Sequence, residues 1–303
     1  MSTLSRLIKN MVWSRQVFAF WQRLGVNVTK KHFYSPIPDG RQLLGQGDLW
    51  EKESELIGLD MNPQGQLRLL EVLASYKEEF DFAVHKTKTP HEFYLLNAAF
   101  SLEDAAVLHG MIRHFRPRTL IEVGGGYSTF VSARAGRLNQ KQGPPMRLIC
   151  IEPYPRQTHL KGFAGLDELI VQKVEQTEIS LFEQLQENDI LFIDSSHVVR
   201  IGGDVNFLYL EVLPRLKKGV VIHIHDIFLP YEYPREWLIR RLHFWTEQYL
   251  LQAFLCGNQS FEVLFANHYM LSKHPEKMAE VFVRPAGYRQ RNIPNSFWIR
   301  KVR

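Results

Sequence analysis

Hydrophobic residues follow two different patterns along this chain, and the pattern changes near residue 118. Before that point, apolar residues recur every three to four positions, which predicts helices over 4–24, 64–82 and 101–115. After it, short apolar runs alternate with longer amphipathic stretches, of which 204–216 is an example. These runs predict strands at 119–123, 147–152, 169–174, 189–194 and 220–225, with helices between them.

Strands that alternate with helices predict an α/β fold with a doubly wound, mostly parallel sheet. Central runs such as 190–193 are apolar on both faces, as strands covered by helices on both sides should be. Later runs at 261–265 and 296–300 are expected to close the sheet as an antiparallel edge. We therefore predict a Rossmann-like domain over residues 91–303, preceded by a mainly helical extension over residues 1–90.

The N-terminal extension combines a basic amphipathic helix at 4–24 with a strap at 32–39 that holds two prolines. Two interpretations of the helix remain open. It packs on the body or on a second subunit, which would give a homodimer, or it lies on an anionic membrane surface as a peripheral contact. The whole extension is expected to contribute to an acceptor pocket or lid.

Composition limits the kinds of binding partner and the cellular compartment that we expect for this protein. The net charge of +5 comes without a block of Lys and Arg or a nucleic-acid motif, so we expect no nucleic-acid partner. The two cysteines, Cys150 and Cys256, lie far apart in apolar runs and are expected to be buried free thiols in a reducing compartment. We expect no transmembrane segment and no secretory signal, hence a cytoplasmic protein.

A glycine turn after the first predicted strand carries the strongest chemical signal. Gly124, Gly125 and Gly126 would let the backbone approach a nucleotide or nucleoside. Glu152, at the end of the second strand, can accept both ribose hydroxyls. A dinucleotide site needs a third glycine where Thr129 stands, and Glu122 would repel a pyrophosphate but accept an ammonium group. The pattern favours S-adenosylmethionine over a nicotinamide cofactor; an oxidoreductase and a non-catalytic cofactor-binding module remain the alternatives.

Polar residues also end the fourth and fifth predicted strands. Asp194 and His197 follow the fourth strand, and His225 and Asp226 follow the fifth. Because parallel strands present their carboxyl ends at one edge of the sheet, these side chains should converge beside the cofactor.

Over about residues 90–303 the chain resembles class I S-adenosylmethionine-dependent methyltransferases, in detail the methyltransferase-24 family. The segments that carry the resemblance are 121–129, 151–155, 191–197 and 223–230. It implies a methyltransferase of class EC 2.1.1 with S-adenosyl-L-methionine as cofactor. The cofactor contacts that it implies are Glu122, Gly124, Gly125, Gly126, Tyr127, Ser128, Glu152 and Asp194.

A looser resemblance extends to metal-dependent O-methyltransferases of the catechol and macrolide-sugar kinds. It implies His197 as general base and Asp194 as a second catalytic residue. The implied metal ligands are Asp194, His225 and Asp226, with His223 as an alternative ligand or else a core histidine. Those enzymes carry an acid or amide at the place of His225, and imidazole favours other metals than Mg, so Mg, Mn, Fe and Zn all stay open. We expect methylation of a hydroxyl on a small molecule, sugar or glycan, with or without metal assistance.

Overall fold

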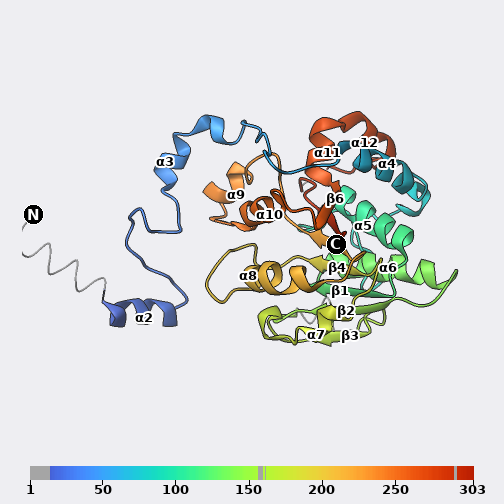
Figure 1. Cartoon of the computed structure of the whole chain (residues 1–303), viewed down its shortest axis with the longest axis horizontal. Coiled ribbons are helices and arrows are strands. Elements are labelled where there is room, and N and C mark those ends of the chain that lie inside the picture. The colour runs from blue at the N-terminus through green and yellow to red at the C-terminus, as the bar shows by residue number, and fades with distance from the viewer. Residues whose placement is uncertain (1–13, 156–159, 161, 290–291) are drawn as a thin grey trace, which may run out of the picture.

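A seven-stranded sheet forms the centre of the computed structural model, which describes residues 14–155, 160, 162–289 and 292–303. The strand order is β3-β2-β1-β4-β5-β7-β6 (Figure 1). All neighbours pair in parallel except β7, which runs antiparallel to both β5 and β6. The strands are β1 (Thr119–Val123), β2 (Arg147–Ile151), β3 (Glu168–Ile170), β4 (Ile190–Ile193), β5 (Val221–Ile224), β6 (Phe261–Ala266) and β7 (Phe297–Lys301). The predicted Rossmann-like doubly wound fold is confirmed.

Helices cover both faces of this sheet. The α-helices of the body are α4 (Pro63–Ala74), α5 (Leu102–Phe115), α6 (Tyr127–Gln140), α7 (Ser180–Glu183), α8 (Asp204–Phe207), α9 (Arg235–Ile239), α10 (Glu247–Leu255), α11 (Asn267–Lys273) and α12 (Pro275–Val281). Short helices of other types are η1 (Gly47–Leu49), η2 (Lys77–Glu79), η3 (Val174–Gln176), the π-helical η4 (Leu208–Val212) and η5 (Leu213–Arg215). Two further helices, α2 (Arg15–Arg23) and α3 (Gly40–Leu44), lie in the N-terminal extension.

Successive side chains along each strand point to opposite faces of the sheet, and each face has its own hydrophobic core. Leu120, Leu148 and Ile190 face one side, where α4, α5, α6, α11 and α12 pack. Their neighbours Ile121 and Ile149 face the other side, which α7, η4 and α10 cover. Because successive strand residues point to opposite faces, each apolar run in the sequence feeds both cores.

Some predicted elements end earlier or change type. The predicted helix over 64–82 stops at Ala74, where the Ser75 hydroxyl donates to the carbonyl of Val72. The helix predicted over 204–216 becomes α8, η4 and η5 in succession, because Pro214 lacks the N–H that a regular helix would use. The predicted strand over 169–174 is only the short β3. Cys256 is exposed, contrary to expectation, whereas Cys150 is buried.

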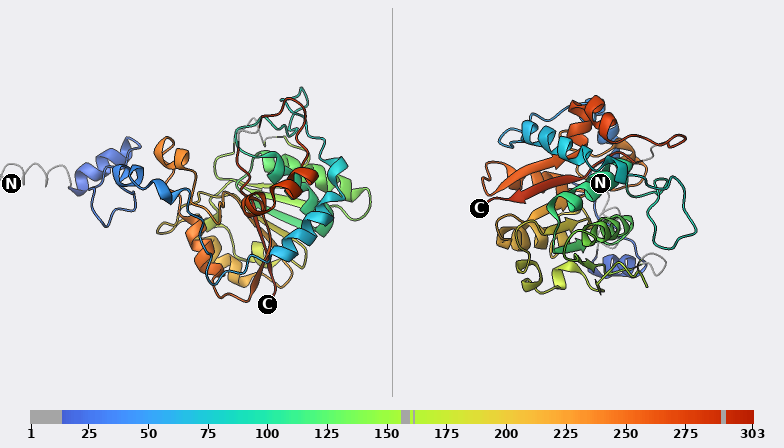
Figure 2. Two further views of the ribbon diagram at one scale, coloured as in Figure 1. Left: turned by 90° about the horizontal axis from the view of Figure 1, so that it is seen from above. Right: turned by 90° about the vertical axis from the view of Figure 1, so that its right-hand side faces the viewer.

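The N-terminal extension divides into a packed half and a projecting half. Leu70, Leu73 and Phe82 share one core with α5 and α6. By contrast, α2 buries none of its residues and stands away from the body (Figures 1 and 2). Residues 4–13 of the helix predicted over 4–24 lie outside the described residues. Among the described residues, no helix is long and apolar enough to cross a membrane.

Candidate active site

The glycine turn after β1 exists because two strand ends meet there. Gly124 has a φ of +86°, and a Cβ at this position would lie 1.9 Å from the carbonyl oxygen of Asp194. At Gly125 a Cβ would lie 2.5 Å from the sulfur of Cys150. Only glycine lets the backbone run this close to its neighbours, so the turn leaves open space above it.

That space is a cavity of about 420 Å³ at the carboxyl edge of the sheet. A second cavity of about 640 Å³ adjoins it and shares Gly124, Glu152, Tyr154 and Asp194 with it. All but one of the predicted cofactor residues line the first cavity. They are Gly124, Gly125, Gly126, Tyr127, Ser128, Glu152 and Asp194.

Glu152 is held in the cavity by backbone amides. Its Oε2 accepts the N–H of Gly125 at 3.2 Å, and its Oε1 accepts the N–H of Tyr154 at 2.6 Å. A carboxylate has about four lone-pair positions, so both oxygens retain capacity to accept hydroxyl groups of a ligand.

Glu122 is the predicted cofactor residue that does not line the cavity. It is fully buried on β1, and its Oε1 accepts the hydroxyl of Ser128 at 2.5 Å. Burial raises the pKa of this carboxyl to about 8, although hydrogen bonds from Ser128 and Thr129 oppose the shift. Its Oε2 has no hydrogen-bond partner among the described residues. Glu122 therefore reaches the cavity through Ser128.

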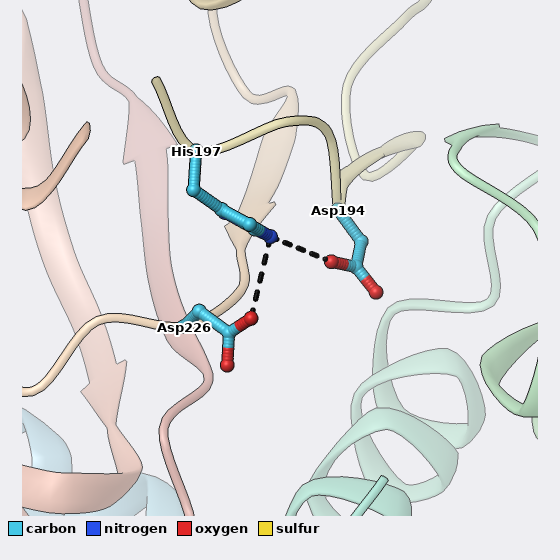
Figure 3. A group of neighbouring side chains, drawn as sticks. All are labelled: Asp194, His197 and Asp226. Atoms are coloured by element: carbon cyan, nitrogen blue, oxygen red, sulfur yellow. Dashed lines mark ion pairs between the residues drawn. The ribbon is translucent and has the colours of Figure 1, made fainter. Parts of the chain in front are cut away.

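A second group of polar residues meets at the ends of β4 and β5 (Figure 3). The Nε2 atom of His197 lies 3.2 Å from Oδ1 of Asp194 and 3.3 Å from Oδ2 of Asp226. Its Nδ1 atom lies 2.8 Å from Oε2 of the buried Glu247. His197 and Asp226 both adopt positive φ angles, 59° and 58°, a strain that is commonly found at functional sites.

Three acidic side chains around the imidazole of His197 raise its pKa. Burial disfavours the imidazolium form of His197, but hydrogen bonds to Asp194 and Glu247 and the charge of Asp226 outweigh burial. Together they raise the pKa of His197 well above its ordinary value. The three neighbouring acids therefore favour the protonated form of His197.

The two histidines of β5 and its end lie to one side of this group. The ring of His223 stacks on Phe192 at a centroid distance of 3.8 Å, and its Nε2 lies 3.0 Å from the hydroxyl of Ser296. His225 packs beside Phe100 at 5.1 Å, and its Nε2 lies 4.0 Å from Oδ1 of Asp226. Their role as metal ligands stays a prediction.

The donor atoms that do come together belong to Asp194, His197 and Asp226. One ligand atom from each lies within 4.8 Å of the others. Two carboxylates and an imidazole are a donor set that divalent ions accept. The buried Glu247 on the far nitrogen of His197 is the kind of partner that orients a metal-binding or proton-accepting histidine. Asp194 and Asp226 therefore fit a divalent ion, with the imidazole of His197 beside it rather than that of His225.

Two residues of this site were missed in the sequence. Glu247 begins α10, where an acid is ordinary in the first turn of a helix and gives no sign of function. Asn295 donates its side-chain amide to Oδ1 of Asp226 at 2.6 Å, and it precedes β7, far along the chain. Neither has a local motif that could have identified it.

Comparisons with known proteins identify the family of the domain that carries this site. Residues 121–227 match the model of the methyltransferase-24 family, described as a methyltransferase domain. An uncharacterized protein of Archaeoglobus fulgidus is 33% identical over 170 residues, which cover 52% of this chain and 74% of that protein.

Several solved structures are similar to this chain, all at low similarity. The O-methyltransferase TomG from Streptomyces achromogenes, in complex with SAM, has a TM-score of 0.41 and 15% identity, with 87% of this chain and 96% of that chain covered. The structure of cmcI-D160 with Mg and SAM has a TM-score of 0.38 and 18% identity, with 66% and 72% covered. Likeness at this level assigns neither an acceptor nor a metal.

Of the three interpretations of the glycine turn, the family match supports the methyltransferase over the oxidoreductase and the non-catalytic module. The cavity beside that turn agrees with the expected cofactor. The chain belongs to the methyltransferase-24 family and is a class I S-adenosylmethionine-dependent methyltransferase.

Proposed function

We propose that this enzyme methylates a hydroxyl group of a small molecule, sugar or glycan, and that His197 accepts the hydroxyl proton. The observation that carries the proposal is the position of the imidazole. Its Nε2 faces Asp194, which also lines the cofactor cavity, while Glu247 holds Nδ1. The proton-accepting atom therefore lies next to the cofactor cavity, as methyl transfer to oxygen requires.

The cofactor half of the site rests on residues around the glycine turn. Bound S-adenosylmethionine supplies an electrophilic methyl group on a sulfonium ion. Glu152 would accept the ribose hydroxyls, and Ser128, backed by Glu122, would meet the amino-acid end. The second cavity, which reaches Lys173 and Ser195, would hold the adenine.

The charge balance around His197 supports a divalent ion. Asp194 and Asp226 would bind it through oxygen, the ligand type that Mg²⁺ and Mn²⁺ prefer. A bound divalent ion would supply the positive charge that the His197 proton now supplies and would lower the pKa of a coordinated hydroxyl. His197, relieved of that proton and still oriented by Glu247, would then be neutral and able to accept the hydroxyl proton at Nε2.

Aromatic rings beside His197 support a flat or ring-shaped acceptor. Trp245 lies 4.4 Å from the ring of His197 and stacks on His243 at 4.7 Å. Trp50 and Leu43 of the N-terminal extension pack in the same cluster. The extension would therefore contribute one wall of the acceptor pocket, and the faces of these rings would contact a sugar or planar acceptor.

A paired acceptor screen tests the proposal. The enzyme is incubated with S-adenosylmethionine and with sugars, phenols and their matched amino derivatives, and formation of S-adenosylhomocysteine is measured with and without Mg²⁺. We expect turnover with a hydroxylated acceptor and little or none with its amino counterpart. Turnover confined to the amines would show that the enzyme is an N-methyltransferase.

A further inference from the structure

A basic arm, defined here as residues 14–38, projects from the body of the molecule (Figures 1 and 2). Its helix α2 is amphipathic along its whole length. At 3.6 residues per turn, the polar residues Arg15, Gln16, Gln22 and Arg23 share one side, and the large apolar residues share the other. The apolar residues are Val17, Phe18, Phe20, Trp21 and Leu24, and none of them is buried.

The strap that follows α2 adds aromatic rings that face solvent. Phe33 is 86% exposed and Tyr34 is 78% exposed, with ring centroids 4.0 Å apart. Ring side chains beside basic residues are typical of segments that enter the interface between water and lipid.

Charge identifies the surface that this arm fits. The first 38 residues contain six Lys or Arg and no Asp or Glu, whereas the rest of the chain is close to neutral. A second copy of the same body therefore carries almost no net negative charge to complement the arm. An anionic lipid bilayer complements both the basic residues and the apolar face. We propose that the arm docks the enzyme on an anionic membrane surface, with α2 lying in the plane of the interface.

Exposed apolar residues on the body point to the same surface. The loop between β4 and α8 carries Ile201, which is fully exposed, next to the exposed Arg200. The segment after α9 carries the exposed Leu242 next to Arg241. Leu43 of α3, the helix that directly follows the arm, packs in the same cluster as Leu238 of α9. These loops also hold the active site, so docking through arm and loops would turn the acceptor side of the enzyme toward the membrane.

Vesicle sedimentation of the full chain tests the proposal. Binding is measured to phosphatidylcholine vesicles with and without phosphatidylglycerol. We expect binding that requires the anionic lipid, and a loss of about fivefold in affinity for each of Arg15, Arg23 and Lys30 changed to Gln. The double variant Phe20→Ser, Leu24→Ser should lose at least about tenfold, because both apolar side chains leave the lipid.

Gln16→Ser with Gln22→Ser is the matched control, since it changes the opposite side of α2 without changing charge. It should bind vesicles like the unaltered chain. Binding of S-adenosylhomocysteine by all variants verifies that the body stays folded. The proposal is overturned if the full chain does not sediment with anionic vesicles, or if the two double variants bind equally. A dimer in light scattering that dissociates in Phe20→Ser, Leu24→Ser would overturn it too, by assigning the arm to a second copy.

Discussion

The Nδ1 atom of His197 lies 2.8 Å from Oε2 of Glu247, a carboxylate that is completely buried. This contact leaves Nε2 as the nitrogen that faces Asp194 and Asp226. A buried acid in this position orients the imidazole and fixes which nitrogen carries a proton, so its effect on the reaction is indirect.

Glu247→Gln should lower kcat by about tenfold to hundredfold, because a neutral amide holds the imidazole less strongly. The affinity for S-adenosylhomocysteine should not change, since Glu247 does not line the cofactor cavity. Steady-state kinetics and calorimetric titration measure the two effects. An unchanged kcat, or an equal loss of cofactor affinity, would show that Glu247 does not position the base.

Asp226→Asn should reduce turnover by at least about tenfold and abolish its response to added Mg²⁺ or Mn²⁺. The substitution keeps the size of the side chain but removes the charge that would hold the ion. Glu211→Gln, which changes an exposed acid on η4, is the control and should behave like the unaltered enzyme. Turnover that is insensitive to both EDTA and Asp226→Asn would remove the metal from the mechanism.

Two neighbouring glycines should respond differently to alanine. Gly124→Ala adds a Cβ that meets the carbonyl of Asp194 and forces a left-handed φ on alanine, so it should destabilise the fold by about 2 kcal/mol or more. At Gly126 an added Cβ would have no atom within 4 Å, and the residue has an extended φ of 178°. Its stability should stay close to that of the unaltered chain. Equal melting temperatures for the two variants in thermal unfolding would contradict the close approach of β1 and β4.

Glu122 should make folding stability depend on pH. Its pKa rises from 4.5 to about 8 on folding, so the folded state holds a proton that the unfolded state releases. This contribution to stability is complete below about pH 4.5 and is lost as pH rises to about 8, with a slope of up to about 1.4 kcal/mol per pH unit.

Glu122→Gln should weaken the pH dependence of the free energy of unfolding between about pH 4.5 and 8. The amide oxygen can still accept the Ser128 hydroxyl, so that hydrogen bond is retained. Free energies of unfolding from urea titrations at several pH values provide the comparison. Parallel curves for the two proteins between pH 5 and 8 would mean that Glu122 does not titrate as described.

The sequence predicted the sheet and the cofactor side of the site because both follow from local patterns. The strands are short apolar runs, and Gly124 to Gly126 with Glu152 stand at strand ends that any parallel sheet brings together. Even there, the sequence did not indicate that Glu122 lies beneath the cavity and reaches it through Ser128. That relation depends on how α6 starts above β1.

The catalytic side could be predicted only in part. The residues that follow β4 and β5 were expected to converge, namely Asp194, His197, His225 and Asp226. Donor atoms of Asp194, His197 and Asp226 do come together, while the ring of His225 lies to one side. The histidine that lies between the two carboxylates is His197, not His225. This choice depends on the loop backbone, namely the positive φ angles at His197 and Asp226. Glu247 and Asn295 arrive from distant segments through tertiary packing, which no local pattern records.

His197→Asn is the most direct test of the central claim. With the acceptor identified by the screen, kcat and the affinity for S-adenosylhomocysteine are measured side by side for the variant and the unaltered enzyme. We predict a loss of about 10²- to 10⁴-fold in kcat, the usual contribution of a general base, with cofactor affinity unchanged. Methyl transfer to the acceptor oxygen at an unaltered rate in His197→Asn would contradict the account.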